Sequence, residues 1–180
     1  MTSQVGAHPD TPTDRTAILS IGSNLGDREA ILREAVAAIA AIDGVEVTAA
    51  SAIIETAAVK LHGVDATAPS YLNAAVTLRT RLDARALLGA LQRIELAHGR
   101  VRAERWGDRT LDIDIVTIGD EVIDKPGLTV PHPRAADRVF VLAPWLELDP
   151  DATLAGFGQV RDLLAQLHEP YREYSAEPLL

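Results

Sequence analysis

Two aspartates stand two residues apart in the apolar segment Leu111-Asp112-Ile113-Asp114-Ile115. Alternate side chains of a strand share a face, so the two carboxylates would project together, roughly 6 to 7 Å apart along the chain. Such a pair suits Mg²⁺, whose octahedron is completed by waters and substrate phosphates. Two ions of this kind can clamp both sides of an in-line displacement at phosphorus. A solvated strand face gives the same pattern, so the pair alone leaves both interpretations open.

An arginine-rich segment comes directly before these acids. Residues 100–109 contain four arginines against two acids, although the whole chain has a formal net charge of −9. Arginine presents a planar fork that bonds phosphate or carboxylate oxygens two at a time. A basic loop beside metal-binding acids favours a polyphosphate substrate, whereas pairing with surplus surface acids is the alternative. The arginines are Arg100, Arg102, Arg105 and Arg109.

Aromatic and amide side chains form a second group of candidates. Tyr71 and Asn73 would share one face of a strand, where a ring and a carboxamide can stack on and hydrogen-bond a flat heterocycle. His132 stands between two prolines, and Arg138 and Phe140 follow it within eight residues. Taken singly, the rings are better explained by core packing, and the histidine by an ordinary surface position.

The composition limits the classes to which the protein can belong. A chain of 180 residues with 47% hydrophobic residues can form one domain, which we expect over residues 17–170 between a disordered N-terminal tail and a C-terminal tail at 171–180. The absence of cysteine excludes disulfides and thiolate metal sites. The acidic balance argues against a general nucleic-acid binder, and no apolar run is long enough for a membrane span. We expect a cytoplasmic monomer that acts on small molecules.

Periodicity predicts the elements that would position these side chains. Alternating apolar residues predict strands, and helices should follow the capping residues Asp27 and Asp83 and end at Gly44 and Gly99. The segment 22–27 lacks the Gly-Lys-Ser/Thr ending of a phosphate loop and is interpreted as a turn. The expected strands are 17–21, 45–55, 71–80 and 111–118, with short helices near 135–146 and 159–167 and a long loop at 57–70. This order predicts a ferredoxin-like α+β fold, a mainly antiparallel sheet with helices packed on it.

Several motifs together, spread from residue 17 to residue 150, resemble the 6-hydroxymethyl-7,8-dihydropterin pyrophosphokinase family. Their order along the chain makes the resemblance specific, whereas the pair of aspartates alone is not a specific signal. The motifs are Ile-Gly-Ser-Asn-Leu-Gly at 21–26, Tyr-Leu-Asn-Ala-Ala-Val at 71–76, Gln-Arg-Ile-Glu at 92–95, Gly-Arg-Val-Arg at 99–102, Arg-Trp-Gly-Asp-Arg-Thr-Leu-Asp-Ile-Asp-Ile at 105–115 and Leu-Thr-Val-Pro-His at 128–132.

The resemblance implies transfer of pyrophosphate from MgATP to the hydroxymethyl group of the dihydropterin, with release of AMP, in folate biosynthesis. It also implies a ferredoxin-like fold. By position, Asp112 and Asp114 would hold two Mg²⁺ ions, and Arg100 and Arg109 would be the catalytic-loop arginines. The ATP side would be formed by Gln92, Glu95, Arg102, Trp106, Ile115, Thr129, His132 and Arg138. The pterin pocket would be formed by Thr56, Tyr71, Asn73, Trp106 and Phe140.

The chain departs from the family pattern at three places. Ala57 and Asp108 stand where the family usually has proline, and Gly127 stands where many members have an arginine that Lys125 would have to replace. Two rival interpretations follow from the residues. One is another two-metal nucleotidyl- or phosphoryltransferase, and the other is a non-catalytic ferredoxin-like binding module.

Overall fold

A computed structural model describes residues 14–57, 59–60, 63–64, 69–99, 110–175 and 177–180. Among these residues, six strands form one antiparallel sheet in the order β12-β3-β6-β1-β7, with β2 pairing with β6 beyond the end of β3. The two crossovers, β1 to β2 and β6 to β7, each skip one strand and contain one helix. This arrangement confirms the expected ferredoxin-like α+β fold. The strands are β1 Arg15–Ser23, β2 Val45–Ala50, β3 Ile53–Thr56, β6 Tyr71–Thr80, β7 Asp112–Ile118 and β12 Tyr171–Ser175.

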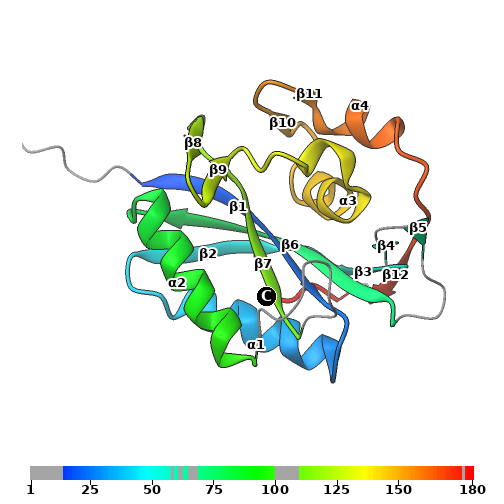
Figure 1. Ribbon diagram of the computed structural model, residues 1–180, viewed down its shortest axis with the longest axis horizontal. Coiled ribbons are helices and arrows are strands. Elements are labelled where there is room, and N and C mark those ends of the chain that lie inside the picture. Colours follow the sequence, from blue (N-terminus) through cyan, green and yellow to red (C-terminus); the bar gives the residue numbers. More distant parts are fainter. Residues whose placement is uncertain (1–13, 58, 61–62, 65–68, 100–109, 176) are drawn as a thin grey trace, which may run out of the picture.

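Helices cover both faces of this sheet (Figure 1). Helices α1 (Arg28–Ala40) and α2 (Ala84–Ala97) lie on one face, and α3 (Val139–Leu148) and α4 (Val160–Ala165) lie on the other. The predicted caps are confirmed: Asp27 accepts the Ala30 N–H at 3.2 Å, and Asp83 accepts two N–H groups of the first turn of α2.

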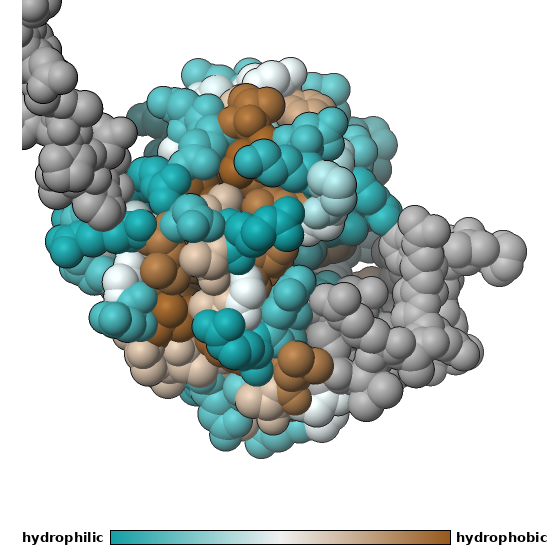
Figure 2. All heavy atoms as spheres, turned by 60° about the vertical axis from the view of Figure 1, so that its left-hand side comes forward, coloured by the Kyte–Doolittle hydropathy of each residue, from teal (hydrophilic) through white to brown (hydrophobic). Residues whose placement is uncertain are grey.

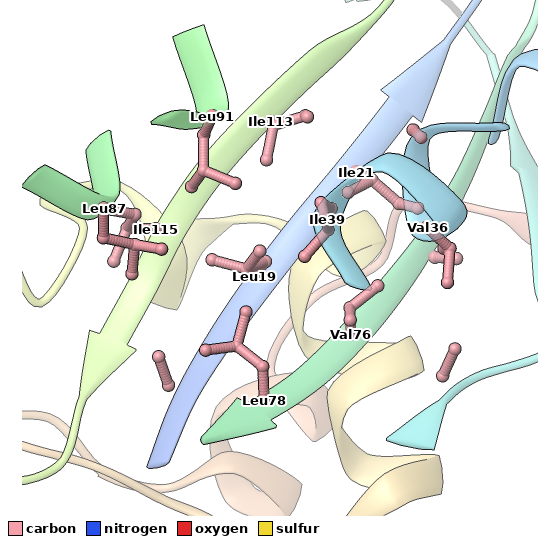
Figure 3. Close-up of a cluster of buried hydrophobic side chains, with 14 of the residues drawn as sticks. Leu19, Ile21, Val36, Ile39, Val76, Leu78, Leu87, Leu91, Ile113 and Ile115 are labelled. Carbon is pink, nitrogen blue, oxygen red and sulfur yellow. The ribbon is translucent and has the colours of Figure 1, made fainter. Parts of the chain in front are cut away.

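The larger core lies between the sheet and the helix pair α1 and α2. Ile113 and Ile115 of β7 point toward Leu87 and Leu91 of α2 (Figure 3), and all four side chains are at most 5% exposed. A smaller core joins the other face to α3 and α4 around Leu142 and Trp145. Because the isoleucines of β7 face the larger core, the aspartates between them face the α3 side.

The expected strand at 45–55 is two strands with a break at Ser51. Ser51 Oγ accepts the Ala75 N–H at 3.0 Å, and the Ala52 N–H donates to Glu147 Oε1 of α3 at 2.9 Å. Regular strand pairing is interrupted here, and the side chains of Ser51 and Glu147 satisfy the two backbone N–H groups.

The expected C-terminal tail at 171–180 is corrected by the structure. Tyr171–Ser175 form strand β12, which pairs with β3, and Leu179 is buried in the larger core. These residues therefore extend the folded domain. At the other end of the chain, β1 begins at Arg15, and the rest of the expected N-terminal tail, residues 1–13, lies outside the described residues.

The remaining elements are short. They include a small separate hairpin that follows β7. They are β4 Val59–Lys60, β5 Gly63–Val64, β8 Ile123–Lys125, β9 Leu128–Val130, a 3₁₀ turn Ala135–Asp137, β10 Thr153–Leu154 and β11 Gly158–Gln159.

The surface on the side of α2, β8 and β9 shows apolar side chains scattered among hydrophilic ones (Figure 2). Val122, which precedes β8, is the most exposed large apolar side chain of the described part, at 78%. Scattered exposure of this kind is ordinary for a globular protein. In the described part of the chain, no helix is long and apolar enough to cross a membrane.

Candidate functional site

The candidate site is organised by strand β1, which lies between β6 and β7. Gly22 of β1 pairs with Asn73 of β6 on one side and with Asp112 of β7 on the other. Two residues earlier, Ser20 pairs with Asp114. Residues directly opposite each other in a sheet point to the same face. Asn73, Asp112 and Asp114 therefore share the face that α3 covers in part.

A carboxylate cluster, defined as Asp112, Asp114, His132 and Arg138, lies on the β7 side of this face. Arg138 donates to Asp114 Oδ2 at 3.4 Å, and His132 Nε2 lies 3.7 Å from the same oxygen. The histidine follows β9, and the arginine immediately precedes α3. Three separate segments thus converge on one carboxylate.

The imidazole of His132 is oriented by the backbone around it. The His132 N–H donates to Val116 O at 2.9 Å, and the Arg134 N–H donates to His132 Nδ1 at 3.1 Å. A nitrogen that accepts a hydrogen bond carries no proton in the neutral ring, so Nε2 carries it and faces Asp114. Burial lowers the pKa of His132, and Arg138 and Arg134 lower it further, although Asp114 acts in the opposite direction. The ring is therefore a neutral donor at physiological pH.

Arg138 is also held against an aromatic ring. Its guanidinium carbon lies 5.3 Å from the centroid of Phe140, a half-buried side chain in the first turn of α3. Burial lowers the pKa of Arg138, while Asp114 raises it, and a guanidinium stays protonated at any physiological pH. This stacking leaves a fixed cation beside the two aspartates.

An amide cluster, defined as Thr56, Tyr71 and Asn73, lies on the β3 and β6 side of the same face. Thr56 pairs with Tyr71, and Asn73 Nδ2 donates to Thr56 Oγ1 at 2.9 Å. Asn73 is 4% exposed, whereas Thr56 and Tyr71 are half-buried. The structure thus brings together three of the residues that the sequence indicated for a flat heterocycle.

Gly22 separates the two clusters and was not predicted as a site residue. A Cβ atom at this position would lie 2.9 Å from Asn73 Oδ1, which is closer than real side chains come. The glycine therefore lets the amide of Asn73 lie against the β1 backbone. Local sequence indicated only a turn, because the role of this glycine depends on which residue of β6 lies opposite it.

The sequence matches a known family over most of its length. The model of the 7,8-dihydro-6-hydroxymethylpterin-pyrophosphokinase (HPPK) family matches residues 18–150. The chain belongs to the HPPK family. It is 46% identical over 132 residues to the 2-amino-4-hydroxy-6-hydroxymethyldihydropteridine pyrophosphokinase of Bacillus subtilis (strain 168), with 73% of this chain and 77% of the relative covered. The enzyme of the same name from Mycobacterium leprae (strain TN) is 44% identical over 170 residues, with 87% and 85% covered.

Solved structures support the same fold. The crystal structure of wild-type Plasmodium falciparum HPPK-DHPS with pteroate superposes with a TM-score of 0.68 at 12% sequence identity. The match covers 88% of this chain and 43% of that chain, so this chain spans less than half of the longer protein. At this identity the likeness shows the fold alone, and it agrees with the sheet order above.

Other residues that the sequence analysis expected on the ATP side lie on α2, β7 and β9. Glu95 of α2 is buried and accepts the Ile113 N–H at 2.8 Å. Gln92 is half-buried one turn earlier, and Thr129 of β9 is exposed. The side chain of Ile115 faces the larger core, which leaves only its backbone groups for a ligand (Figure 3). Arg100, Arg102, Trp106 and Arg109 lie outside the described residues.

The donor set of the carboxylate cluster fits magnesium. Asp112 and Asp114 are partly exposed, lie on one face and offer only oxygen. The described residues contain no group of three or more His, Cys, Asp or Glu side chains that could enclose a metal by themselves. Mg²⁺ is usually bound through one or two carboxylates, with waters and phosphate oxygens as the other ligands. The site therefore suits a hydrated ion that arrives with a phosphate substrate.

One departure from the HPPK pattern has a backbone explanation. Gly127 lies between β8 and β9 with a φ of +77°, and nothing lies within 4 Å of the position that a Cβ atom would take. An arginine there would have the space but would strain the backbone, whereas glycine adopts this conformation freely. Lys125, which the sequence suggested as a substitute cation, is exposed at the end of β8.

Proposed function

We propose that this chain transfers the pyrophosphoryl group of ATP to the hydroxymethyl group of 6-hydroxymethyl-7,8-dihydropterin, with release of AMP, as a step of folate biosynthesis. One observation carries the proposal beyond family membership: the amide cluster and the carboxylate cluster share one sheet face and are separated only by Gly22. Two strand spacings amount to about 10 Å, a distance that a bicyclic ring with its hydroxymethyl arm largely fills.

The amide cluster would bind the pterin. Tyr71 and Phe140 would stack on its two faces, while Asn73 and Thr56 would bond donors and acceptors on its edge. The bond from Asn73 to Thr56 supports this role because it fixes the amide before a ligand arrives. A ring held in this way directs its hydroxymethyl group toward β7.

The carboxylate cluster would bind the triphosphate. Asp112 and Asp114 would hold two Mg²⁺ ions, which when bound neutralise phosphate charge and help to hold the reacting groups in line. His132 would donate through Nε2, and Arg138 would bond a phosphate oxygen. Gln92, Glu95, Ile115 and Thr129 would line the nucleotide site, and Arg102 and Trp106 would complete it.

The chemical step moves one group between two oxygens. The hydroxymethyl oxygen attacks the β-phosphorus of ATP and loses its proton to solvent or to a carboxylate. The bond between the β-phosphorus and the oxygen bridging to the α-phosphorus breaks, so that AMP leaves. Reactions of this type need alignment and charge stabilisation more than covalent help from the protein. Arg100 and Arg109 would supply positive charge at this stage.

Product analysis tests the proposal against its rivals. The protein is incubated with MgATP and hydroxymethyl-dihydropterin, and the nucleotide products are separated by chromatography. We expect AMP and a diphosphorylated pterin in equal amounts, formed only when both substrates are present. ADP or free pyrophosphate would favour another two-metal transferase, and binding without turnover would favour a non-catalytic module. The same preparation shows by sedimentation whether the protein is the monomer that we propose.

A further inference from the structure

Glu55 forms an ionic cluster on the reverse side of the sheet from the amide cluster. This residue of β3 is 6% exposed, and it accepts hydrogen bonds from three side chains. Arg28 donates to its Oε1 at 2.9 Å, Arg172 donates to its Oε2 at 2.7 Å, and the Ser70 hydroxyl donates to Oε1. Arg28 also donates to Ser70 O at 2.8 Å. Four segments are therefore joined at one carboxylate.

The joined segments are those that support the amide cluster. Arg28 is the first residue of α1, Ser70 directly precedes Tyr71, and Arg172 belongs to the C-terminal strand β12. On the backbone, Glu55 pairs with both Leu72 and Arg172. The next residue, Thr56, pairs with Tyr71 on one side and Tyr171 on the other. A shift at Glu55 would thus move Thr56, and with it the hydrogen bond to Asn73.

We propose that Glu55 is a positioning residue for the pterin side of the site, and that β12 takes part in this role through Arg172. The inference rests on the proposed function. Residue 172 lies outside residues 18–150, which the HPPK family model matches. The side-chain bond from Arg172 of β12 to Glu55 thus comes from a part of the chain that the family match does not include.

The electrostatics of Glu55 support an ionised carboxylate that is fixed in place within the ionic cluster. Burial raises the pKa of this carboxyl, but the hydrogen bonds from Ser70, Arg28 and Arg172 outweigh burial and lower the pKa from 4.5 to about 2. Glu55 is therefore ionised throughout the physiological range. A neutral glutamine of the same shape would keep the packing and lose the charge-assisted bonds.

Three variants separate positioning from general stability. Glu55→Gln removes the negative charge, Arg172→Gln removes only the side-chain ion pair between β12 and Glu55, and Arg172→Lys keeps the positive charge. The matched control is Glu46→Gln, which breaks the ion pair with Arg79 on β2 and β6 of the same sheet, away from the amide cluster. For each variant we measure KM for pterin, KM for ATP, kcat and the melting temperature.

We expect Glu55→Gln to raise KM for pterin by about tenfold while KM for ATP changes by less than about twofold. Arg172→Gln should give a smaller change in the same direction, Arg172→Lys should restore most of it, and Glu46→Gln should match the unsubstituted protein. Equal increases in both KM values, or a lower melting temperature with unchanged KM for pterin, would overturn the positioning role.

A binding measurement keeps this inference separate from the proposed reaction. Pterin fluorescence is titrated with each protein in the presence of a non-hydrolysable ATP analogue and Mg²⁺. If the unsubstituted protein binds pterin but forms no AMP, the proposed reaction fails, and a weaker Kd for Glu55→Gln still supports the positioning role. Unchanged pterin affinity in Glu55→Gln overturns the positioning role even where AMP is formed.

Discussion

The two clusters that share one sheet face are held in place by different kinds of interaction. The amide cluster depends on strand register: Thr56 and Asn73 are fixed by paired backbones, one neutral hydrogen bond and the missing side chain of Gly22. The carboxylate cluster depends mainly on the charge of Arg138, which meets Asp114 at 3.4 Å, while the neutral ring of His132 lies 3.7 Å from the same carboxylate. Shape therefore defines one half of the site, and electrostatics defines the other.

The two sides of the site also differ in the face of the sheet on which their carboxylates lie. On the β3 and β6 side, the ionised carboxylate Glu55 lies on the reverse face of the sheet, bonded by its own arginines. On the β7 side, Asp112 and Asp114 lie on the site face and are partly exposed. In the proposed function, a flat neutral ring would meet fixed polar groups, whereas a charged phosphate chain would meet partly solvated carboxylates of the kind that bind Mg²⁺.

The largest effect is expected from removing charge on the β7 side. Asp114→Ala should lower kcat by several orders of magnitude, because it would remove a proposed magnesium ligand and the carboxylate partner of Arg138. KM for pterin should change far less, since Asn73 and Thr56 are untouched. The rate of AMP formation at saturating substrates checks the first expectation, and circular dichroism checks that the fold is intact.

Asp124→Ala serves as the control for that substitution. Asp124 is an exposed carboxylate on β8, outside both clusters, so its removal changes the net charge equally and leaves the site alone. A loss of kcat similar to that of Asp114→Ala would mean that overall charge, and not the carboxylate cluster, is responsible. A loss of kcat of less than about tenfold in Asp114→Ala would contradict the proposed role of Asp114 as a metal ligand.

A second effect, of intermediate size, concerns the ionic cluster around Glu55, behind the amide cluster. Since the pKa of Glu55 is lowered to about 2, its contribution to stability is complete above pH 4.5 and is lost as pH falls toward 2. The difference in unfolding free energy between the unsubstituted protein and Glu55→Gln should therefore shrink by about 2 kcal/mol from pH 6 to pH 3. Urea denaturation at several pH values measures it. If the difference in unfolding free energy were independent of pH, the Glu55 carboxylate would not be ionised in the folded protein as inferred.

Local sequence predicted most of the fold because its signals are local. Alternation located β1, β6 and β7, and Asp27 and Asp83 marked the starts of α1 and α2. The break between β2 and β3 was missed because one of its hydrogen-bond partners, Glu147, lies 95 positions further along the chain from Ala52. Strand β12 was missed because its segment is polar and exposed, and Arg172 is anchored to a residue 117 positions away.

The same distinction applies to the site. The shared face of Asp112 and Asp114 follows from the period of a strand and needs no knowledge of the rest of the molecule. The neighbourhood of Asn73 and Gly22 requires the sheet order and the register, which no local pattern supplies. Chemistry carried by one strand is therefore predictable, whereas chemistry divided between strands becomes visible only in the fold.

The smallest effect is also the most direct test of the steric half of the comparison. Gly22→Ala adds one Cβ atom, which would lie 2.9 Å from Asn73 Oδ1 and push the amide from its place beside Thr56. We expect KM for pterin to rise by about tenfold, close to 1.4 kcal/mol, with KM for ATP nearly unchanged. Gly89→Ala is the matched control, because a Cβ atom in that helix meets only the end of the Arg93 side chain at 3.8 Å. If Gly22→Ala weakened ATP and pterin equally, the added methyl group would be acting on β1 as a whole, and the separation of the site into a steric half and an electrostatic half would fail.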